Sequence, residues 1–524
     1  MFTKFSRTLF LLLILSLLFA GIGALPARAQ SAAVSMEAWA GYNGYFKYGQ
    51  WLPVWVELDN NGGDLEAEIQ VRVNMAIFAV PVSLPAGAHK VVPLYVIPTN
   101  FAREIKVQLV DQNQQEITSR MVQVFPQANY TYLAGIVAAE RGAIALLSGA
   151  KIPGLERPMV LVDIPPAELP EQSESLSSFD LIVLNDIDTS LLSPRQVKSL
   201  QEWIGGGGRL VIGGGAGALR TLSGLGEALN PVVFSSLAEV ESADLAPLAV
   251  FAAAESIQSA GKVPVSLVKA DEADIVAGDD RMPLLVEKRF EKGWVDFIAL
   301  DLSQTPFNGW SGTPLFWQTL ITPGGTYPQN MPMDMSMRQL RASNIPYALS
   351  NMPMLNLPSI GSLAVLLGIY ILLVGPVNYI VLRRLKKLHL AWATIPALTL
   401  VFAGGAFGIS FSVRGTNVVI NQISVIEPKS GTTANVTSYF GLFSPGEKAY
   451  QVSVDSKGLA SPLAGFNGEW DIWGPGMNPT ANTQPAMTYL QTQPIQVRCI
   501  TVAQWSMQNF MLEETWEDFG TVEA

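Results

Sequence analysis

The chain has 524 residues, 49% of them hydrophobic, and a formal net charge of −11, which allows several domains with a large buried core. The acidic balance excludes nucleic-acid binding, because affinity for phosphates depends on Lys and Arg. Cys499 is the only cysteine in the sequence, so no internal disulfide can form.

The first 29 residues have the order of an export signal. Lys4 and Arg7 precede an uncharged run from Thr8 to Leu25, and Ala27-Arg28-Ala29 provides a small-x-small cleavage site. We expect residues 1–29 to be a signal peptide that is cut before Gln30. If it stays uncut, it is a first membrane anchor with the same orientation.

Residues 30–126 contain short alternating segments that are typical of antiparallel strands. In LEAEIQVRV (65–73) every second residue is apolar, and the turn signal NNGG (60–63) precedes it. REIKVQLV (103–110) alternates in the same way. The sequence therefore predicts an extracytoplasmic β-sandwich over residues 30–126.

One predicted strand, QWLPVWVEL (50–58), has two different faces. Its Leu and Val residues point to the core, which leaves Trp51 and Trp55 on the other side. Sugar-binding surfaces use aromatic platforms, so these two residues are candidates for a glycan contact. The alternative is that they pack against a neighbouring loop or domain, as most large aromatic side chains do.

Residues 127–325 change to alternating strands and helices. YLAGIVA, PMVLVDIP, FDLIVLNDID, RLVIGG and GWVDFIALDLS are apolar on both faces, and RGAIALLSGA and SPRQVKSLQEWI have helical patterns between them. Such an order predicts an α/β doubly wound domain with a parallel sheet.

Two glycine clusters flank the strand RLVI (209–212). Gly205–Gly208 follow a predicted helix and are expected to end it. Gly213, Gly214, Gly215 and Gly217 follow the strand at the carboxyl end, the edge where open α/β sheets bind ligands. The second cluster lacks the Lys and the hydroxyl residue of a P-loop, and its match to a dinucleotide-binding fingerprint is loose.

The segment from Tyr130 to about Ile321 resembles the class I glutamine amidotransferase-like fold found in exported domains of bacterial membrane proteins. The resemblance rests on FDLIVLNDID, LQEWIGGGGRLVIGGG and EKGWVDFIALDLSQTPFNGWSGTPLFW. It implies a flavodoxin-like sheet with a G-x-C-x-G elbow after one strand. Here the five matching residues are Gly213-Gly214-Gly215-Ala216-Gly217, so Gly215 stands at the position of the nucleophile and the triad is lacking.

The residue inventory also disfavours Cys-His or Ser-His catalysis in this segment. The two histidines of the chain, His89 and His389, lie outside residues 127–325, and so does Cys499. Nucleophilic catalysis by Cys or Ser usually needs an adjacent base, most often His. We therefore expect no catalytic residue and no cofactor. We also expect Cys499 to be buried, because it alternates with Ile495 and Val497 in IQVRCITV.

Acidic residues follow several of the predicted strands. If those strands are neighbours, their carboxyl ends converge, and clustered carboxylates are a candidate site for Ca²⁺ or Mg²⁺. The alternative is that each Asp caps a helix or shapes a turn. The candidates are Asp163, Asp186, Asp188 and Asp301.

The segment 326–357 is a linker rich in Met and Pro, and a transmembrane hairpin over 358–413 is predicted to follow it. Residues 359–382 and 390–412 contain no charge and are long enough to span a bilayer. Between them the basic loop 383–389 carries two Arg and two Lys, which places it in the cytoplasm and both flanks outside. M-x-M spacing in the linker suits Cu(I), although adaptable packing is the simpler use of these methionines.

Glycines recur along both predicted membrane helices, where small residues allow close helix packing with each other or with a partner. They are Gly361, Gly368 and Gly375 on the first helix and Gly404 and Gly408 on the second.

After the hairpin, short strand patterns predict a second extracytoplasmic β domain over 414–524, which is expected to be incomplete at its end.

The whole arrangement resembles a group of uncharacterised multi-pass bacterial membrane proteins with most of their mass outside the cell. Our first hypothesis is a non-catalytic, membrane-anchored scaffold or binding protein of the cell envelope, whose partners are the lipid bilayer and an envelope protein or glycan. The second is an accessory subunit of a transporter or envelope assembly that docks through its hairpin. The third is a metal-dependent hydrolase that uses the strand-end Asp residues.

Overall fold

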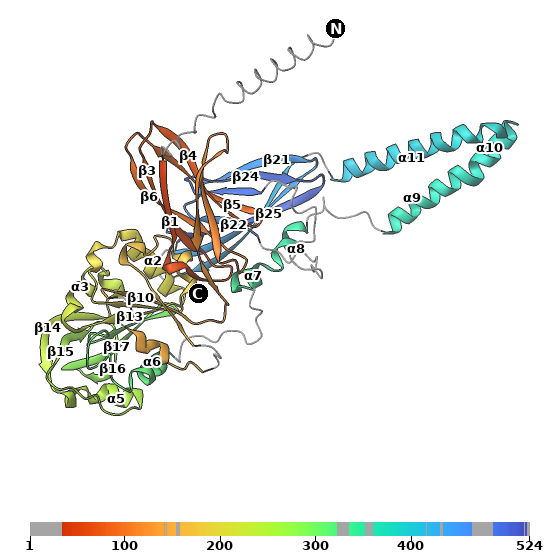
Figure 1. Cartoon of the computed structure of the whole chain (residues 1–524). Helices are drawn as coiled ribbons and strands as arrows, with labels where there is room; N and C mark the ends of the chain where they lie inside the picture. The colour runs from red at the N-terminus through yellow and green to blue at the C-terminus, as the bar shows by residue number, and fades with distance from the viewer. Residues whose placement is uncertain are drawn as a thin grey trace, which may run out of the picture.

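The computed structural model describes residues 34–140, 142, 144–153, 158–321, 335–351, 360–414, 417–429, 433–463, 486–517 and 519–520. The predicted signal peptide lies outside these residues, as do most of the methionines of the predicted linker. The described part is multidomain and rich in strands, with two apolar helices that project from a folded body (Figure 1).

The N-terminal region forms two facing antiparallel layers. The strands β1 (Val34–Ala40), β3 (Leu52–Asn60) and β6 (His89–Val96) make one layer. The strands β4 (Leu65–Val73), β5 (Ala76–Leu84), β7 (Glu104–Asp111) and β8 (Glu116–Gln123) belong to the other. The alternation seen in the sequence decides which face is buried: Leu52, Val54, Val56 and Leu58 are fully buried.

Strands from the C-terminal region complete the second layer, which differs from the expected separate β domain over 414–524. β23 (Met487–Leu490) pairs in parallel with β5, and β24 (Ile495–Val502) and β21 (Lys448–Val454) continue the sheet, giving seven strands. The physical reason is that β5 would otherwise be an open edge with unpaired backbone groups. A pairing between residues about 400 positions apart leaves no local pattern in the sequence.

The remaining C-terminal strands form a four-stranded antiparallel sheet. Its order is β19 (Val419–Pro428), β20 (Ala434–Ser444), β25 (Ser506–Trp516) and β22 (Leu459–Pro462). The short helices α7 (Met337–Ala342) and α8 (Ile345–Ser350) precede the apolar helices in the chain, and α8 packs on β19 and β20.

Cys499 in β24 is exposed, so the prediction that it is buried is wrong. The register between β21 and β24 shifts, so that Tyr450 pairs with Ile500 but Val452 pairs with Val497. Cys499 lies in this bulge with a φ of 57°. One extra residue in a strand moves the following side chains to the opposite face, and Ile500 and Val502 are buried in its place.

The central region contains a second seven-stranded sheet, with the order β11-β10-β12-β13-β18-β17-β16. Five strands are parallel: β10 (Leu133–Ala138), β11 (Val160–Asp163), β12 (Leu181–Asn185), β13 (Arg209–Gly213) and β18 (Gly293–Ile298). β17 (Met282–Phe290) and β16 (Asp274–Asp279) extend the sheet antiparallel. Every residue of β12 and β13 is buried, in keeping with strands covered on both faces.

The connections around this sheet contain both the expected helix and shorter ones. α2 (Pro194–Gly205) begins with a capping box formed by Ser193 and Gln196, and Gly207, with a φ of 118°, follows its end. The segment RGAIALLSGA, expected to be helical, forms only a 3-10 turn at Ala145–Gly149 among its described residues. The other helices are α3 (Ala218–Ser223), α4 (Gly226–Leu229), α5 (Ala246–Ala252) and α6 (Thr313–Ile321), and β14 (Val232–Val240) pairs with β15 (Val263–Ala270).

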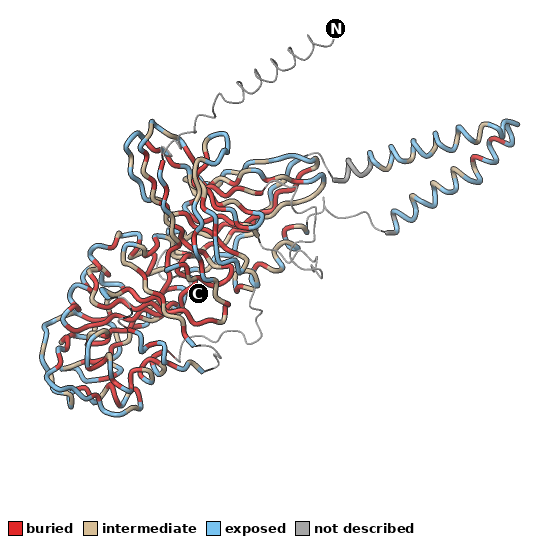
Figure 2. The backbone as a smooth tube through the Cα atoms, in the orientation of Figure 1, coloured by how far each residue is buried: buried red, intermediate tan, exposed pale blue. Residues whose placement is uncertain are grey.

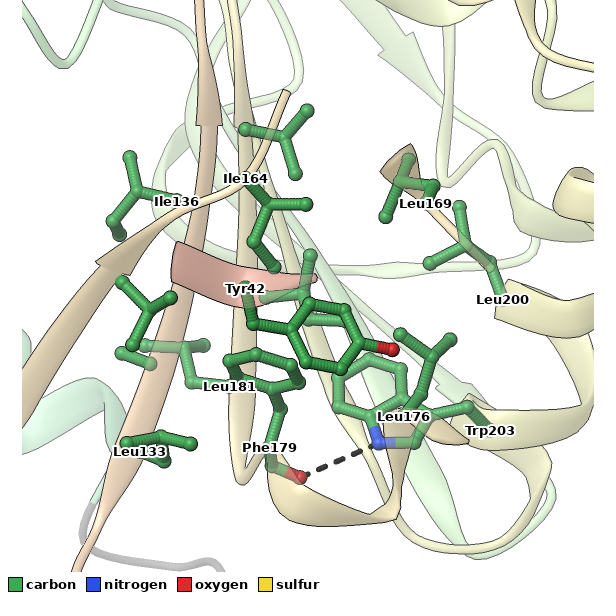
Figure 3. Packing of buried hydrophobic residues seen from close by; sticks show 14 of the residues in the cluster. Tyr42, Leu133, Ile136, Ile164, Leu169, Leu176, Phe179, Leu181, Leu200 and Trp203 are labelled. Carbon is green, nitrogen blue, oxygen red and sulfur yellow. Dashed lines mark hydrogen bonds between the residues drawn. The ribbon is translucent and has the colours of Figure 1, made fainter. Parts of the chain in front are cut away.

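Tyr42 joins the N-terminal layers to the central sheet. Its ring packs edge-on against Phe179 with centroids 4.8 Å apart, and its hydroxyl donates to the carbonyl oxygen of Ser175. Figure 3 shows the Tyr42 ring among aliphatic residues of the central region, beside Trp203, whose Nε1 donates to the carbonyl oxygen of Phe179. The two regions therefore share one continuous hydrophobic core.

The two apolar helical segments, Leu363–Arg384 and Leu388–Gly408, are long and apolar enough to cross a membrane, and hardly any of their surface is covered by the rest of the chain (Figure 2). The first consists of α9 (Ile360–Leu372), a π turn at Leu373–Val377 that contains Pro376, and α10 (Asn378–Arg384). The second consists of a 3-10 turn at Leu388–Leu390 and most of α11 (Ala391–Arg414). A Cβ atom at Gly368, Gly375, Gly404 or Gly408 would meet nothing within 4 Å, and Gly361 is exposed, so these glycines do not pack the two helices together.

Candidate functional site

The glycine-rich loop after β13 is closed by its own chain. The backbone N–H groups of Gly214 and Gly215 donate to the carbonyl oxygens of Leu300 and Ala299, at 2.9 and 3.1 Å. A Cβ atom at Gly215 would lie 2.8 Å from the backbone nitrogen of Asp301, and one at Gly217 would lie 2.1 Å from Asp186 Oδ1. These two N–H groups are already used, so they cannot bind a phosphate or an oxyanion. The glycines allow close packing at this edge.

The strand-end aspartates lie at the carboxyl edge, and each uses its polar groups locally. Asp186 pairs with the Arg220 guanidinium, and Asp188 accepts from the backbone N–H and hydroxyl of Ser190. Asp301 accepts from Asn185 Nδ2 at 2.9 Å and from Ser303.

Asp163 differs in that its carboxylate accepts, among the described residues, only one long hydrogen bond, from the N–H of Gly142 at 3.3 Å. Within the described ranges, the group of three potential metal ligands that lie within 4.8 Å of one another is Glu57, Asp59 and His89, on the N-terminal sheet. The structure therefore does not bring Asp163, Asp186, Asp188 and Asp301 together as one set of ligands.

A cavity of about 720 Å³ lies at the opposite, amino edge of the parallel strands. Its walls include the starts of β13 and β18 with the loop after α2, the faces of β20 and β25, helix α7, the segment with Gln50 and Trp51, and the turn at Ser173–Ser178. Its volume is within the range of small-molecule sites. The residues that line the cavity include Trp203, Gly208, Arg209, Trp294, Arg338, Tyr439, Met511 and Glu513.

Arg209 is the central buried charge of the sheet wall. Its Nε and Nη2 donate to Asp296 at 2.6 and 2.9 Å, and Nη2 also donates to Glu287 at 2.5 Å. Asp296 is fully buried, and this burial raises the pKa of its carboxyl to about 6 against the lowering effect of Arg209. Arg209 Nη1 is buried and has no hydrogen-bond partner in the described part of the chain.

A second buried pair lies nearby. Lys47 Nζ donates to Asp180 Oδ2 at 2.6 Å. Burial lowers the pKa of Lys47 and raises that of Asp180, so both shifts have desolvation as their main cause. Asp180 also accepts from the backbone N–H of Leu133, which fixes the start of β10.

Glu174 lines the cavity and forms no salt bridge with any residue that the structure describes. Burial raises the pKa of its carboxyl to about 7. By surface area the residue is only partly buried, because the cavity exposes it to water while protein surrounds the cavity. A carboxyl group that titrates near neutral pH beside a cavity is a common property of binding and catalytic sites.

The other walls are tied together through Glu513 on β25. Arg338 on α7 donates to both carboxylate oxygens, from Nε at 2.8 Å and from Nη2 at 2.6 Å. Trp51 Nε1 donates to the same carboxylate at 2.8 Å, and the Arg338 guanidinium lies over the Trp51 ring. The three residues connect the N-terminal layers, α7 and the four-stranded sheet.

The positions of Trp51 and Trp55 bear on the predicted glycan contact. Trp51 is 1% exposed, so it offers no ring face on the outer surface of the sheet, although it does line the cavity. Trp55 is partly buried, and its Nε1 is buried without a hydrogen-bond partner among the residues described. The packing alternative describes Trp51 better than an exposed platform does.

The cavity at the amino edge was not predicted from the sequence. One signal was present, because Arg209 and Asp296 are single charged residues inside runs that are otherwise apolar, RLVI and WVDFIAL. Charged residues in such strands are buried only when they are paired, so two opposite charges of this kind indicate a contact. The wall formed by β20 and β25 comes from strands far along the chain, and the sequence contains no sign of it.

One family model matches part of the chain. The family model described as Domain of unknown function (DUF8726) matches residues 33–124. This range agrees with the N-terminal strands β1 to β8. No curated protein matches the chain.

Solved structures show weak likenesses. The cytoplasmic protein STM1381 from Salmonella typhimurium LT2 is 18% identical, covers 37% of this chain and 100% of its own, and has a TM-score of 0.28. The exo-beta-1,4-mannosidase Op5Man5 from Opitutaceae bacterium strain TAV5 is 10% identical, with 36% and 35% covered and a TM-score of 0.24. Likenesses of this size carry no argument about fold or function.

Proposed function

We propose that the chain is a non-catalytic, membrane-anchored binding protein of the bacterial envelope, with its folded body outside the cell and its ligand in the cavity at the amino edge. The proposed ligand is an envelope protein segment or a glycan. The observation that carries the binding role is the cavity itself. Buried charges meet there with Trp51 of the N-terminal region and with Trp203 and Trp294 of the central region.

The strand pairing supports the membrane arrangement. β5 precedes the apolar hairpin and β23 follows it, yet the two strands are hydrogen-bonded neighbours. The regions before and after the hairpin must therefore lie in the same compartment, so the chain crosses a membrane an even number of times between them. The basic loop 383–389 favours the cytoplasm for the turn, which leaves the body outside.

The strand order supports the doubly wound interpretation of the central region. Taken in chain order, the parallel strands are arranged 2-1-3-4-5, the order of flavodoxin-like sheets. This order agrees with the resemblance to class I glutamine amidotransferase-like domains. With Gly215 in place of the nucleophile and its N–H group bonded to Ala299, the proposed role of this domain is structural.

A second candidate function is an accessory subunit of a transporter or envelope assembly. The open faces of Gly368, Gly375, Gly404 and Gly408 favour it, since nothing in the described part of the chain packs against them. Small residues of this kind let a partner helix approach closely.

Site-specific photocrosslinking in living cells distinguishes the two candidates. A photoreactive residue at Lys292 tests the cavity, one at Val365 tests the hairpin, and one at Val250, which is 79% exposed on α5, is the control. We expect a specific adduct from Lys292 and none from Val250. Adducts from Val365 alone would favour the accessory subunit and contradict ligand binding in the cavity.

The exposed native Cys499 tests the orientation of the body. We expect a membrane-impermeant maleimide to label Cys499 in intact cells. In a Cys499→Ser background, Lys386→Cys in the basic loop should be labelled only after the membrane is permeabilised. The reverse pattern would show that the folded body lies in the cytoplasm.

A further inference from the structure

The outer face of the sheet β1-β3-β6 carries a group of side chains that can bind a metal. Glu57 and Asp59 are two residues apart on β3, so both project from the same face. His89 on β6 pairs directly with Asp59 in the register of the two strands. His89 Nδ1 lies 2.8 Å from Asp59 Oδ1 and 3.8 Å from Glu57 Oε1. One ligand atom from each residue lies within 4.8 Å of the others.

The charges on this face are unbalanced. Glu37 on β1 is directly opposite Glu57, and like charges at directly opposite positions destabilise a sheet. The neighbouring positions on the same face are Ser35, opposite Asp59, and Val91, opposite Glu57. Three carboxylates therefore share one face with His89 and with no Lys or Arg among the paired positions. Lys90 is directed elsewhere, because its Nζ donates to the carbonyl oxygen of Ser83.

The spacing of the ligand atoms suits a small divalent ion. Zinc binds imidazole nitrogen and carboxylate oxygen at about 2.0–2.1 Å, so two ligands of one tetrahedral ion are about 3.3 Å apart. The two distances from His89 Nδ1 lie on either side of this value. The side chains of His89, Asp59 and Glu57 are 58%, 47% and 34% exposed, which leaves them free to adjust by a few tenths of an ångström.

We propose that Glu57, Asp59 and His89 form a surface site for a divalent transition metal. A donor set with one imidazole nitrogen favours zinc over Ca²⁺ and Mg²⁺, which take oxygen ligands. The bound ion would neutralise the opposed carboxylates and link the edge strand β6 to β3. This site is separate from the cavity at the amino edge and does not depend on the proposed function.

The chain has two histidines and one cysteine, so few other side chains compete with His89 for zinc. The experiment uses the full chain in mild detergent with Cys499 alkylated. Zinc affinity is measured by competition with a chromophoric chelator. We expect one zinc ion per chain. His89→Ala and the conservative variant Glu57→Gln should each weaken zinc binding by tenfold or more. The matched control His389→Ala, in the basic loop, should bind as the unmodified sequence does.

Two results would overturn the site. One is that His89→Ala retains the same zinc affinity, and the other is that His389→Ala removes binding. The affinity for Ca²⁺ distinguishes a metal site that needs His89 from a cluster of carboxylates alone. If Ca²⁺ bound as tightly as zinc and His89→Ala left both unchanged, only the carboxylates would be acting. Because His89 is exposed and Glu57 is partly exposed, melting curves without metal should be alike for all variants and confirm that they fold.

Discussion

The two edges of the parallel sheet in the central region differ in what their polar groups do. At the carboxyl edge the glycine loop is hydrogen-bonded to the end of β18, and Asp186, Asp188 and Asp301 bind groups of their own chain. At the amino edge, Arg209 and Glu174 line a cavity of about 720 Å³. The contrast teaches that buried charge beside a cavity indicates a site more directly than a glycine-rich loop at the customary edge does.

The largest expected effect is at the amino edge, where Arg209→Met removes the partner of a fully buried carboxylate. Leaving Asp296 unpaired should lower the free energy of unfolding by about 3–5 kcal/mol at pH 8. The measurement is chemical denaturation of the full chain in detergent. The guanidinium groups of Arg209 and Arg289 both lie over the ring of Trp294, so the matched control is Arg289→Met, which removes the exposed one. If both variants lose the same stability, the amino edge is not held by this ion pair.

The next effect tests how tightly the carboxyl edge is closed. Gly215 has a φ of 70°, and an added Cβ would lie 2.8 Å from the backbone of Asp301. Gly215→Ala should lower the free energy of unfolding by about 2–4 kcal/mol, the sum of left-handed strain and overpacking.

Gly226→Ala is the control for that variant, because Gly226 has a φ of 73° and nothing within 4 Å of the added Cβ. It should show only the strain, about 1–2 kcal/mol. Equal melting temperatures for the two variants would mean that the carboxyl edge has room for a side chain, and with it for a ligand.

A pH-dependent effect at the cavity comes third. Glu174 has a pKa raised from 4.5 to about 7, so the folded protein binds this proton more tightly than the unfolded chain does. The resulting stability is present below pH 4.5 and is lost as the pH rises through 7. Glu174→Gln cannot ionise, so it should be more stable than the unmodified sequence by about 1–3 kcal/mol at pH 8 and nearly equal to it at pH 4.

Thermal melts across this pH range measure the difference. Glu239→Gln provides the comparison, since Glu239 is an exposed carboxylate on β14. A pH-independent gain for Glu174→Gln would contradict a buried, titrating carboxyl group at the cavity. If Glu239→Gln gave the same gain in stability, the gain would come from the change in overall charge.

The strands and the helix that were predicted from the sequence are those that local residue patterns determine. Alternation in LEAEIQVRV and the apolar runs of the central strands are local, and β4, β12, β13 and β18 lie where these patterns place them. The helix over Pro194–Gly205 follows equally local signals, with Ser193 before it and glycines after it.

The features that the sequence did not predict depend on distant pairing or on one local irregularity. The β5–β23 pairing and the cavity walls from β20 and β25 join segments that are hundreds of residues apart. The bulge at Cys499 reverses an alternation that is correct for Ile495 and Val497. The strand-end aspartates follow strands of one sheet, but their partners, such as Arg220 and Ser303, could not be chosen from the sequence alone.

The smallest effect concerns Asp186 and decides whether the carboxyl edge keeps any role as a metal site. Asp186 pairs with Arg220, whose side chain is 60% exposed, so the ion pair is open to solvent. Asp186→Asn should change the free energy of unfolding by less than about 1 kcal/mol. Melting temperatures with and without millimolar Ca²⁺ or Mg²⁺ are the measurement, and neither ion should shift them in the unmodified sequence or in the variant. A shift that Asp186→Asn abolishes would revive the metal-dependent hydrolase hypothesis. Such a shift would also require the ion pair between Asp186 and Arg220 to break on metal binding. The carboxylate of Asp186 cannot fully bind the guanidinium and the metal ion at the same time.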